Sequence, residues 1–293
     1  MNIIDEHYVI QFKAKLQLAA QQTVSRLESF CETIAITGEK AAYDGLGTVE
    51  ARESTSRYER IKTASIEHLR RRITGKMCYV SIDVDEKDLV QILSDPSGKY
   101  SMAMMASMNR KKDMIIARAA LASVYTGKDM DTLTTFANDG GLTVDATAGL
   151  VKEKLDEINR NFIDNDVNIE ESVNVGLTVT GKEHESLLNE VEFINIDYTS
   201  QRPVDSGKIK RANGLELVLY GANAEVPILD VTSGVRSCIA LAQGAVALGV
   251  WMDIDLEIKD IPDLLKVKRI TTSMYMGATR TDGKKVQKVT TTA

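Results

Sequence analysis

The sequence predicts an α+β fold, because helical and strand-like patterns fall into separate blocks along the chain. Residues 95–126 carry the clearest helical pattern, and residues 147–220 alternate between helical and strand-like segments. After Asp253 only strand-like segments remain. With 293 residues, 43% of them apolar, the chain can bury a core in one large domain or two smaller ones.

The first 80 residues contain few side chains that could form a core of their own. Residues 1–30 form at most a weakly amphipathic helix, and residues 34–36 are strand-like. From Arg52 to Lys76, eight basic residues stand against three acidic ones, a local charge of +5. Because a long, charged, two-stranded excursion is unstable alone in water, we expect it to lie on a partner surface.

The pattern over residues 95–126 predicts a long helix. Asp95 suits the N-cap, Pro96 suits the first helical position, and Gly127 suits the C-terminal stop. An apolar stripe at helical spacing follows: Tyr100, Met104, Met108, Ile115 and Ala119. About 30 residues at about 1.5 Å each give a rod of roughly 45 Å, far longer than an average helix.

Shorter elements are predicted in the rest of the chain. The apolar run 238–252 is shorter than the roughly 20 residues of a membrane helix, and we interpret it as a buried strand followed by a small-residue helix. Asp282-Gly283 predicts a hairpin turn between the last two strands. The other expected helices lie at residues 147–162 and 182–190, and the expected strands at residues 173–180, 215–220, 255–258, 270–276 and 285–289.

No residue pattern points to catalysis, to a cofactor or to a metal. Motifs for phosphate binding, dinucleotide binding, serine hydrolysis and zinc proteolysis are absent from the sequence. Cys31, Cys78 and Cys238 form no CxxC pair, so neither a disulfide framework nor a zinc site is predicted. The net charge of -6 argues against nucleic-acid binding through overall charge. We expect a non-enzymatic protein without a membrane anchor, made in a reducing cytoplasm.

Five groups of residues, taken in chain order, carry a resemblance to one known family. They are His7-Tyr8-Val9 with Phe12, Gln21-Gln22 and Ser25-Arg26-Leu27; Gly38-Glu39 with Tyr43-Asp44 and Arg57; His68 with Arg70, Arg71 and Arg72; Asp95-Pro96 with Tyr100, Arg110, Asp113 and Gly127; and Gly277-Ala278-Thr279-Arg280 with Val286. Their order and spacing, over nearly the whole chain, resemble the major capsid proteins of tailed bacteriophages, which have the Hong Kong 97-type fold.

This resemblance implies a division of the chain and a set of partners. The implied parts are an N-terminal arm (1–30), an extended E-loop hairpin (31–80), a peripheral domain with a long spine helix (81–130), an axial domain (131–237) and the closing strands of the peripheral domain (238–293). Self-assembly into hexamers and pentamers of an icosahedral head is implied, in the host cytoplasm, around double-stranded DNA held by non-specific contact. Because the arm begins at residue 1, either a separate scaffolding protein is expected or the chain is a processed form. A portal is also expected as a partner, and decoration proteins are a further possible partner. No crosslinking is predicted.

Charge predicts how neighbouring subunits meet. The loop carries a set of arginines: Arg52, Arg57, Arg60, Arg70, Arg71 and Arg72. Residues 77–98 carry five acidic residues against Lys87, a charge of -4, and these are Asp83, Asp85, Glu86, Asp88 and Asp95. Since complementary potentials favour correct docking, we expect the loop arginines of one subunit near the carboxylates of the next. We favour this pairing over phosphate contact for the run of three arginines.

The expected spine helix has a second basic set. Its members are Lys99, Arg110, Lys111, Lys112 and Arg118, with Asp113 as their lone acidic neighbour. Two interpretations stay open. The basic face meets packaged DNA by charge alone, or it pairs with carboxylates in the E-loop or arm of an adjacent subunit.

Two other functions stay open at this point. An encapsulin-like shell would share the fold and enclose a cargo enzyme, so co-purifying nucleic acid or cargo protein separates it from a phage head. An unrecognised enzyme that uses carboxylates of residues 131–237 belongs to a different class. The absence of clustered histidine, cysteine or nucleotide-binding motifs argues against that enzyme.

Overall fold

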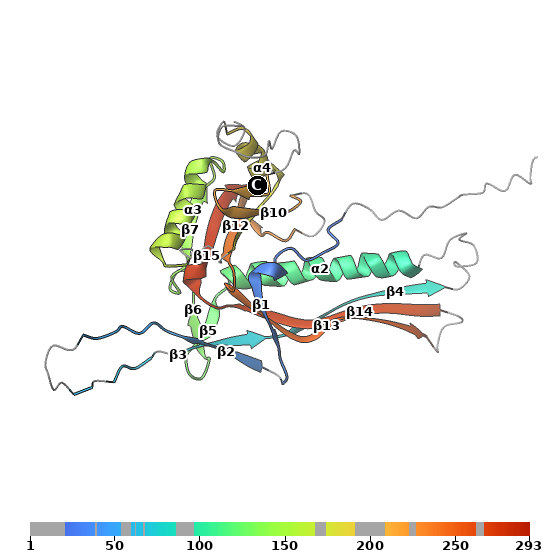
Figure 1. Cartoon of the computed structure of the whole chain (residues 1–293). Coiled ribbons are helices and arrows are strands. Elements are labelled where there is room, and N and C mark those ends of the chain that lie inside the picture. Colours follow the sequence, from blue (N-terminus) through green and yellow to red (C-terminus); the bar gives the residue numbers. More distant parts are fainter. Residues whose placement is uncertain are drawn as a thin grey trace, which may run out of the picture. The chain divides into compact units, whose positions relative to one another are not determined.

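The computed structural model describes residues 21–38, 40–53, 60–61, 63–66, 68–85, 97–167, 174–190, 209–222, 227–261 and 267–293. The chain divides into two compact units. The smaller unit consists of Met1–Ser25, Met77–Arg110 and Met252–Tyr275, and the larger one of Arg26–Lys76, Lys111–Trp251 and Met276–Ala293. Helices and mixed sheets confirm the α+β class (Figure 1).

The larger unit is built on a mixed sheet. β12 (Val235–Ala242) is antiparallel to both β15 (Val286–Thr292) and β8 (Val175–Val179), while β7 (Leu142–Ala146) runs parallel to β15 and β10 (Leu215–Leu219) parallel to β8. The short β11 (Val231–Thr232) pairs with β12. In spatial order the other strands are β7, β15, β12, β8, β10 and β9 (Arg211–Ala212).

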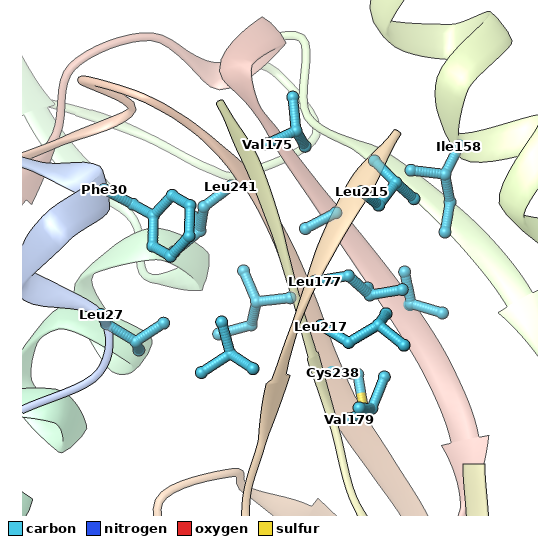
Figure 2. Close-up of a cluster of buried hydrophobic side chains, with 14 of the residues drawn as sticks. Leu27, Phe30, Ile158, Val175, Leu177, Val179, Leu215, Leu217, Cys238 and Leu241 are labelled. Carbon is cyan, nitrogen blue, oxygen red and sulfur yellow. The ribbon is translucent and has the colours of Figure 1, made fainter. Parts of the chain in front are cut away.

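Both faces of this sheet are covered, which explains why β8 is buried at all five positions. Helix α3 (Lys152–Asp164) turns Leu155, Ile158 and Phe162 to one side, as the helical repeat requires, and packs near β7 (Figure 1). Figure 2 shows Ile158 on one side of the strands and Leu27 and Phe30 on the other. The segment before β1 (Cys31–Ala35) therefore completes the core.

A second sheet carries the long hairpin of the larger unit. β2 (Lys40–Leu46) and β3 (His68–Thr74) pair antiparallel over seven positions, from Lys40 opposite Thr74 to Leu46 opposite His68. β5 (Val124–Thr126) and β6 (Thr132–Thr134) extend the sheet beyond β3. Residues 47–67, which we call the hairpin loop, continue past the strand ends, as their described parts in Figure 1 show.

The third sheet has the order β1-β13-β14-β4, with β1 parallel to β13. Within the smaller unit, Val84, Met104 and Ile270 are buried together, with half-buried Tyr100 and Leu256 around them. Met104 belongs to α2 (Ser97–Leu121), which at about 1.5 Å per residue is about 37 Å long. The strands are β1 (Cys31–Ala35), β13 (Val246–Asp260), β14 (Val267–Arg280) and β4 (Lys76–Asp85).

Two expectations about the C-terminal third are wrong. Residues 238–252 form no helix, because they lie in the strands β12 and β13, which are joined by a turn over residues 243–245. Strands buried on both faces have continuous apolar sequences, and small residues in such sequences are equally compatible with a helix. Asp282-Gly283 is no hairpin turn either. β14 and β15 lie in different sheets, joined by the short helix η3 (Gly283–Lys285).

Other predicted elements are confirmed with shifted ends. α2 stops at Leu121, five residues early, because residues 124–126 form β5, and the expected cap Asp95-Pro96 lies outside the described residues. Met104 and Met108 are buried as expected, whereas Ile116 and Ala120 replace the half-buried Ile115 and Ala119. α3 begins five residues late, while β8, β10 and α4 (Gly181–Leu188) match closely.

The described residues contain neither a membrane-spanning helix nor a cluster of metal-binding side chains. No helix among them is long and apolar enough to cross a membrane. No group of three or more metal-binding side chains occurs in that part of the chain.

Candidate interaction surfaces

The hairpin loop presents large apolar side chains to solvent. Ile61 is 96% exposed and Leu46, at its start, is 68% exposed. Val49 and Ile66 are also exposed. Scattered apolar residues on a surface are ordinary, but several on one extension without a core favour a surface that another molecule covers. The loop is therefore the first candidate interaction surface.

The structure separates the six loop arginines into different environments. Arg52 and Arg60 are exposed, and Arg57 lies outside the described residues. Arg70 is also exposed and forms an ion pair across the hairpin, with its Nε 2.6 Å from Asp44 Oδ1. The Arg70 hydrogen bond holds the pKa of the Asp44 carboxyl below its usual range. Pairing of the loop arginines with a neighbouring subunit stays a prediction.

Arg71 and Arg72 turn toward their own chain. Arg72 stacks its guanidinium 3.7 Å from the ring centre of Tyr125 on β5. Arg71 is buried and holds Asp139 with both terminal nitrogens, at 2.8 and 2.7 Å. These two residues thus fix the base of the hairpin to β5 and to the turn before β7.

Asp139 also binds a second buried arginine. Arg280, the last residue of β14, is fully buried and places its Nε 2.7 Å from Asp139 Oδ2. Its Nη1 donates to the carbonyls of Ala120 and Ala122 at the end of α2, at 2.8 and 2.9 Å. We call Arg71, Asp139 and Arg280 the hairpin clamp. Arg71 and Arg280 belong to the motifs that carried the family resemblance, whereas the sequence pattern did not single out Asp139.

Acid should weaken the hairpin clamp. Burial by itself raises the pKa of the Asp139 carboxyl, but hydrogen bonds from Arg71 and Arg280 outweigh burial and hold the pKa below the ordinary 3.8. A carboxyl with a lowered folded pKa contributes stability that is present above its unfolded pKa and is lost as the pH falls through the folded pKa. We expect this contribution to be constant near neutral pH and to decrease progressively as the pH falls from about 4 through the lowered folded pKa.

Denaturant midpoints of wild type and Asp139→Asn, measured from pH 7 to pH 2, test this expectation. The difference between the two proteins should shrink in acid, because the amide does not titrate. Parallel loss of stability in both proteins would show that other carboxyls cause the acid sensitivity.

The acidic set expected to meet the loop is described only in part. Asp83 on β4 forms a two-pronged ion pair with Arg269 on β14, at 2.7 and 2.8 Å. The Arg269 hydrogen bond lowers the pKa of Asp83. Asp85 is the last residue of β4, while Glu86, Asp88 and Asp95 lie outside the described residues. Contact of this acidic set with the loop arginines of a neighbouring subunit stays a prediction.

The basic set on α2 also divides. Lys112 is buried and pairs with Glu28 at 3.1 Å, and the exposed Arg118 pairs with Asp230 at 3.3 Å. The half-buried Arg110 donates to the side-chain oxygen of Gln21 and the backbone carbonyl of Gln22, at 2.8 and 3.1 Å. The remaining members, Lys99 and Lys111, are exposed. They are the members best placed to meet an outside anion.

Asp113 is a structural residue whose role the sequence analysis missed. It is fully buried in α2 and accepts hydrogen bonds from the backbone amides of Arg26, at 3.0 and 3.1 Å, and Leu27, at 3.3 Å. The Tyr220 hydroxyl donates to it at 2.9 Å, and burial followed by this charge raises the pKa of Tyr220. A single carboxylate directly before the apolar run Met114-Ile115-Ile116 was the available signal.

Comparison with known proteins identifies relatives. A family model described as phage capsid protein matches residues 4–293. The capsid of Cyanophage P-SCSP1u is 13% identical, with a TM-score of 0.73 over 98% of this chain and 94% of that one. A structure of Mycobacterium phage Che8 is 12% identical, with a TM-score of 0.70 over 96% and 97%. The mature capsid of bacteriophage PhiM1 is 11% identical, with a TM-score of 0.68 over 94% and 89%. No curated protein matches.

Proposed function

Since the chain belongs to the phage capsid protein family, we propose that it is the major capsid protein that assembles into the head of a tailed bacteriophage. The observation that carries this proposal is the match over residues 4–293, together with a fold shared with several phage capsids. The protein is a structural component of the virion. Its function is association with copies of itself.

We infer the role of each part of the chain in the capsid subunit from the surfaces of the larger unit and of α2. The β2–β3 hairpin with its loop acts as the E-loop, and its exposed Leu46, Val49 and Ile61 support this role because they are available to a second copy. Helix α2 acts as the spine helix, and residues 1–30 as the arm. The peripheral (81–130 and 238–293) and axial (131–237) domains complete the Hong Kong 97-type subunit.

The partners follow from this assignment. The subunit forms hexamers and pentamers of an icosahedral shell, with a separate scaffolding protein and a portal during assembly in the host cytoplasm. Packaged DNA is met by charge alone. The exposed Lys99 and Lys111 support that contact, because their charges are accessible to phosphate. Arg118 and Lys112 contribute less, since each has a carboxylate partner in the chain.

Electron microscopy of the purified chain tests the proposed function. We expect closed shells, sheets or rings of uniform subunits, and shells isolated from infected cells should protect DNA from nuclease. A compact monomer at every concentration, with and without co-expressed scaffolding protein, would contradict the proposal. Shells that enclose a cargo enzyme and no nucleic acid would support the encapsulin-like alternative instead.

A further inference from the structure

The β2–β3 hairpin is anchored to the rest of its unit near its base, where Arg72 stacks on Tyr125 and the Tyr43 hydroxyl donates to Glu32 at 3.0 Å. β3 meets β5 at one paired position, Arg71 opposite Thr126. Toward the hairpin loop, His68, Leu69 and Arg70 are all exposed. In the other direction, Ile73 is buried in a small cluster with other apolar side chains. Arg71 is therefore the buried side chain of β3 that lies nearest the hairpin loop.

Asp139 offers Arg71 a rigid seat. The turn that contains Asp139 packs so closely on η3 that a Cβ atom added at Gly283 would lie 2.1 Å from the Asp139 carbonyl oxygen. Arg280 holds the same carboxylate while its other end is fixed to the carbonyls at the end of α2. Movement of Arg71 away from Asp139 therefore has to break the two hydrogen bonds of the fork, because Asp139 is itself held by η3 and by Arg280.

The composition of the hairpin clamp favours a directional role over a stabilising one. Two buried guanidinium groups share one carboxylate, and among the described residues Arg71 Nε and Arg280 Nη2 are buried without a hydrogen-bond partner. Buried ion pairs are poor sources of stability, because desolvation offsets their attraction. A two-pronged arginine–carboxylate pair does fix both distance and angle.

We propose that Asp139, through Arg71, is the positioning residue that sets the direction in which the β2–β3 hairpin leaves its unit, and thereby the curvature of the assembled shell. This inference rests on the proposed function, because curvature has meaning only for a shell. In a closed assembly each contact is repeated by symmetry, so a small change in its direction changes whether and at what size the assembly closes. The clamp acts on geometry, while the apolar loop supplies the attraction.

Arg71→Met tests the proposal with a matched control. This variant removes the two hydrogen bonds from Arg71 but leaves Asp139 paired with Arg280, so the buried site keeps one anion and one cation. Arg236→Met removes another buried arginine of the same unit, which pairs with Glu183 at 3.4 Å on the β12–α4 side. Both variants lose a buried ion pair, but only the first one lies at the hairpin.

Hydrogen exchange and particle diameter are the two measurements. In Arg71→Met, amides of residues 40–46 and 68–74 should exchange at least tenfold faster than in wild type, and particles should vary in diameter or stay open. Arg236→Met should keep wild-type exchange in these peptides and a wild-type diameter. Arg71→Lys, which keeps the charge without the fork, should resemble Arg71→Met.

Three results would overturn the proposal: wild-type exchange at the hairpin in Arg71→Met, uniformly faster exchange throughout the larger unit, or particles of wild-type diameter from loosened hairpins. Failure of the proposed function gives a different result, namely a wild-type chain that forms no particles under any condition. In that case the exchange data still decide whether the clamp holds the hairpin. The claim about shell curvature would then be abandoned together with the proposed capsid function.

Discussion

Ile61→Asp should abolish shell formation and leave the subunit folded. The Ile61 side chain is 96% exposed in the single chain, so the substitution removes no internal contact and should change the free energy of unfolding by less than about 0.5 kcal/mol. Burial of an isoleucine against a neighbouring subunit contributes about 1.5–3 kcal/mol at each contact. An aspartate loses this contribution and adds the cost of desolvating a charge. Because every subunit repeats the contact, the loss multiplies over the shell.

Light scattering and electron microscopy measure assembly, and thermal unfolding measures the fold. Ile61→Leu is the matched control, because it keeps the apolar volume, and it should assemble like wild type. Normal shells from Ile61→Asp would show that the hairpin loop is held by backbone pairing or by its arginines. Charge reversal of Arg52 and Arg60 by substitution would then be the next test. If the arginines hold the loop, raised salt should weaken assembly.

Asp113→Ala should lower the free energy of unfolding by about 3–5 kcal/mol. The substitution leaves two backbone amides, those of Arg26 and Leu27, and the Tyr220 hydroxyl without their acceptor. A buried donor left unpaired costs about 1–3 kcal/mol. These amides also place Leu27 and Phe30 over the sheet, where a Cβ at Gly176 would lie 2.6 Å from the Phe30 ring. Loss of the acceptor therefore disturbs the core as well.

Denaturant unfolding provides the measurement, with the slope checked for constancy. Tyr220→Phe removes only the hydroxyl donor and should cost about 0.5–1.5 kcal/mol. Asp113→Ala should also expose Arg26, Leu27 and Glu28 to protease before the rest of the larger unit is cut. A midpoint for Asp113→Ala close to that of Tyr220→Phe would show that the backbone amides find other acceptors, and that Asp113 does not hold this segment.

The sequence carried enough information for the fold class and the family, because both depend on patterns repeated along the chain. Apolar runs located β8 and β10, and helical spacing located α2. The same reasoning failed at residues 238–252, where Ala240, Ala242, Ala245 and Ala247 serve tight packing between strands and their covering layers. Small residues satisfy a helix and a doubly covered strand equally well.

Polar contacts between residues far apart in the chain could not be predicted from local sequence patterns. Arg71 meets Asp139 across 68 residues of chain, and Asp113 meets the Arg26 amide across 87. Charge counts placed all the loop arginines in one group, because a count records sign and not burial. Only the fold distinguishes the exposed Arg70 from the buried Arg71, one position away on the opposite face of β3.

The position of β15 has a consequence for how the subunit is made. β15 is the last described strand in chain order, yet it lies between β7 and β12 and pairs with both. A ribosome synthesises β7 about 140 residues before β15, so β7 remains without this partner strand for about half of translation. The nascent chain cannot close this sheet until residues 286–292 have emerged. We therefore expect completion of the sheet, rather than synthesis of the hairpin loop, to set the moment at which a newly made subunit becomes competent to join others.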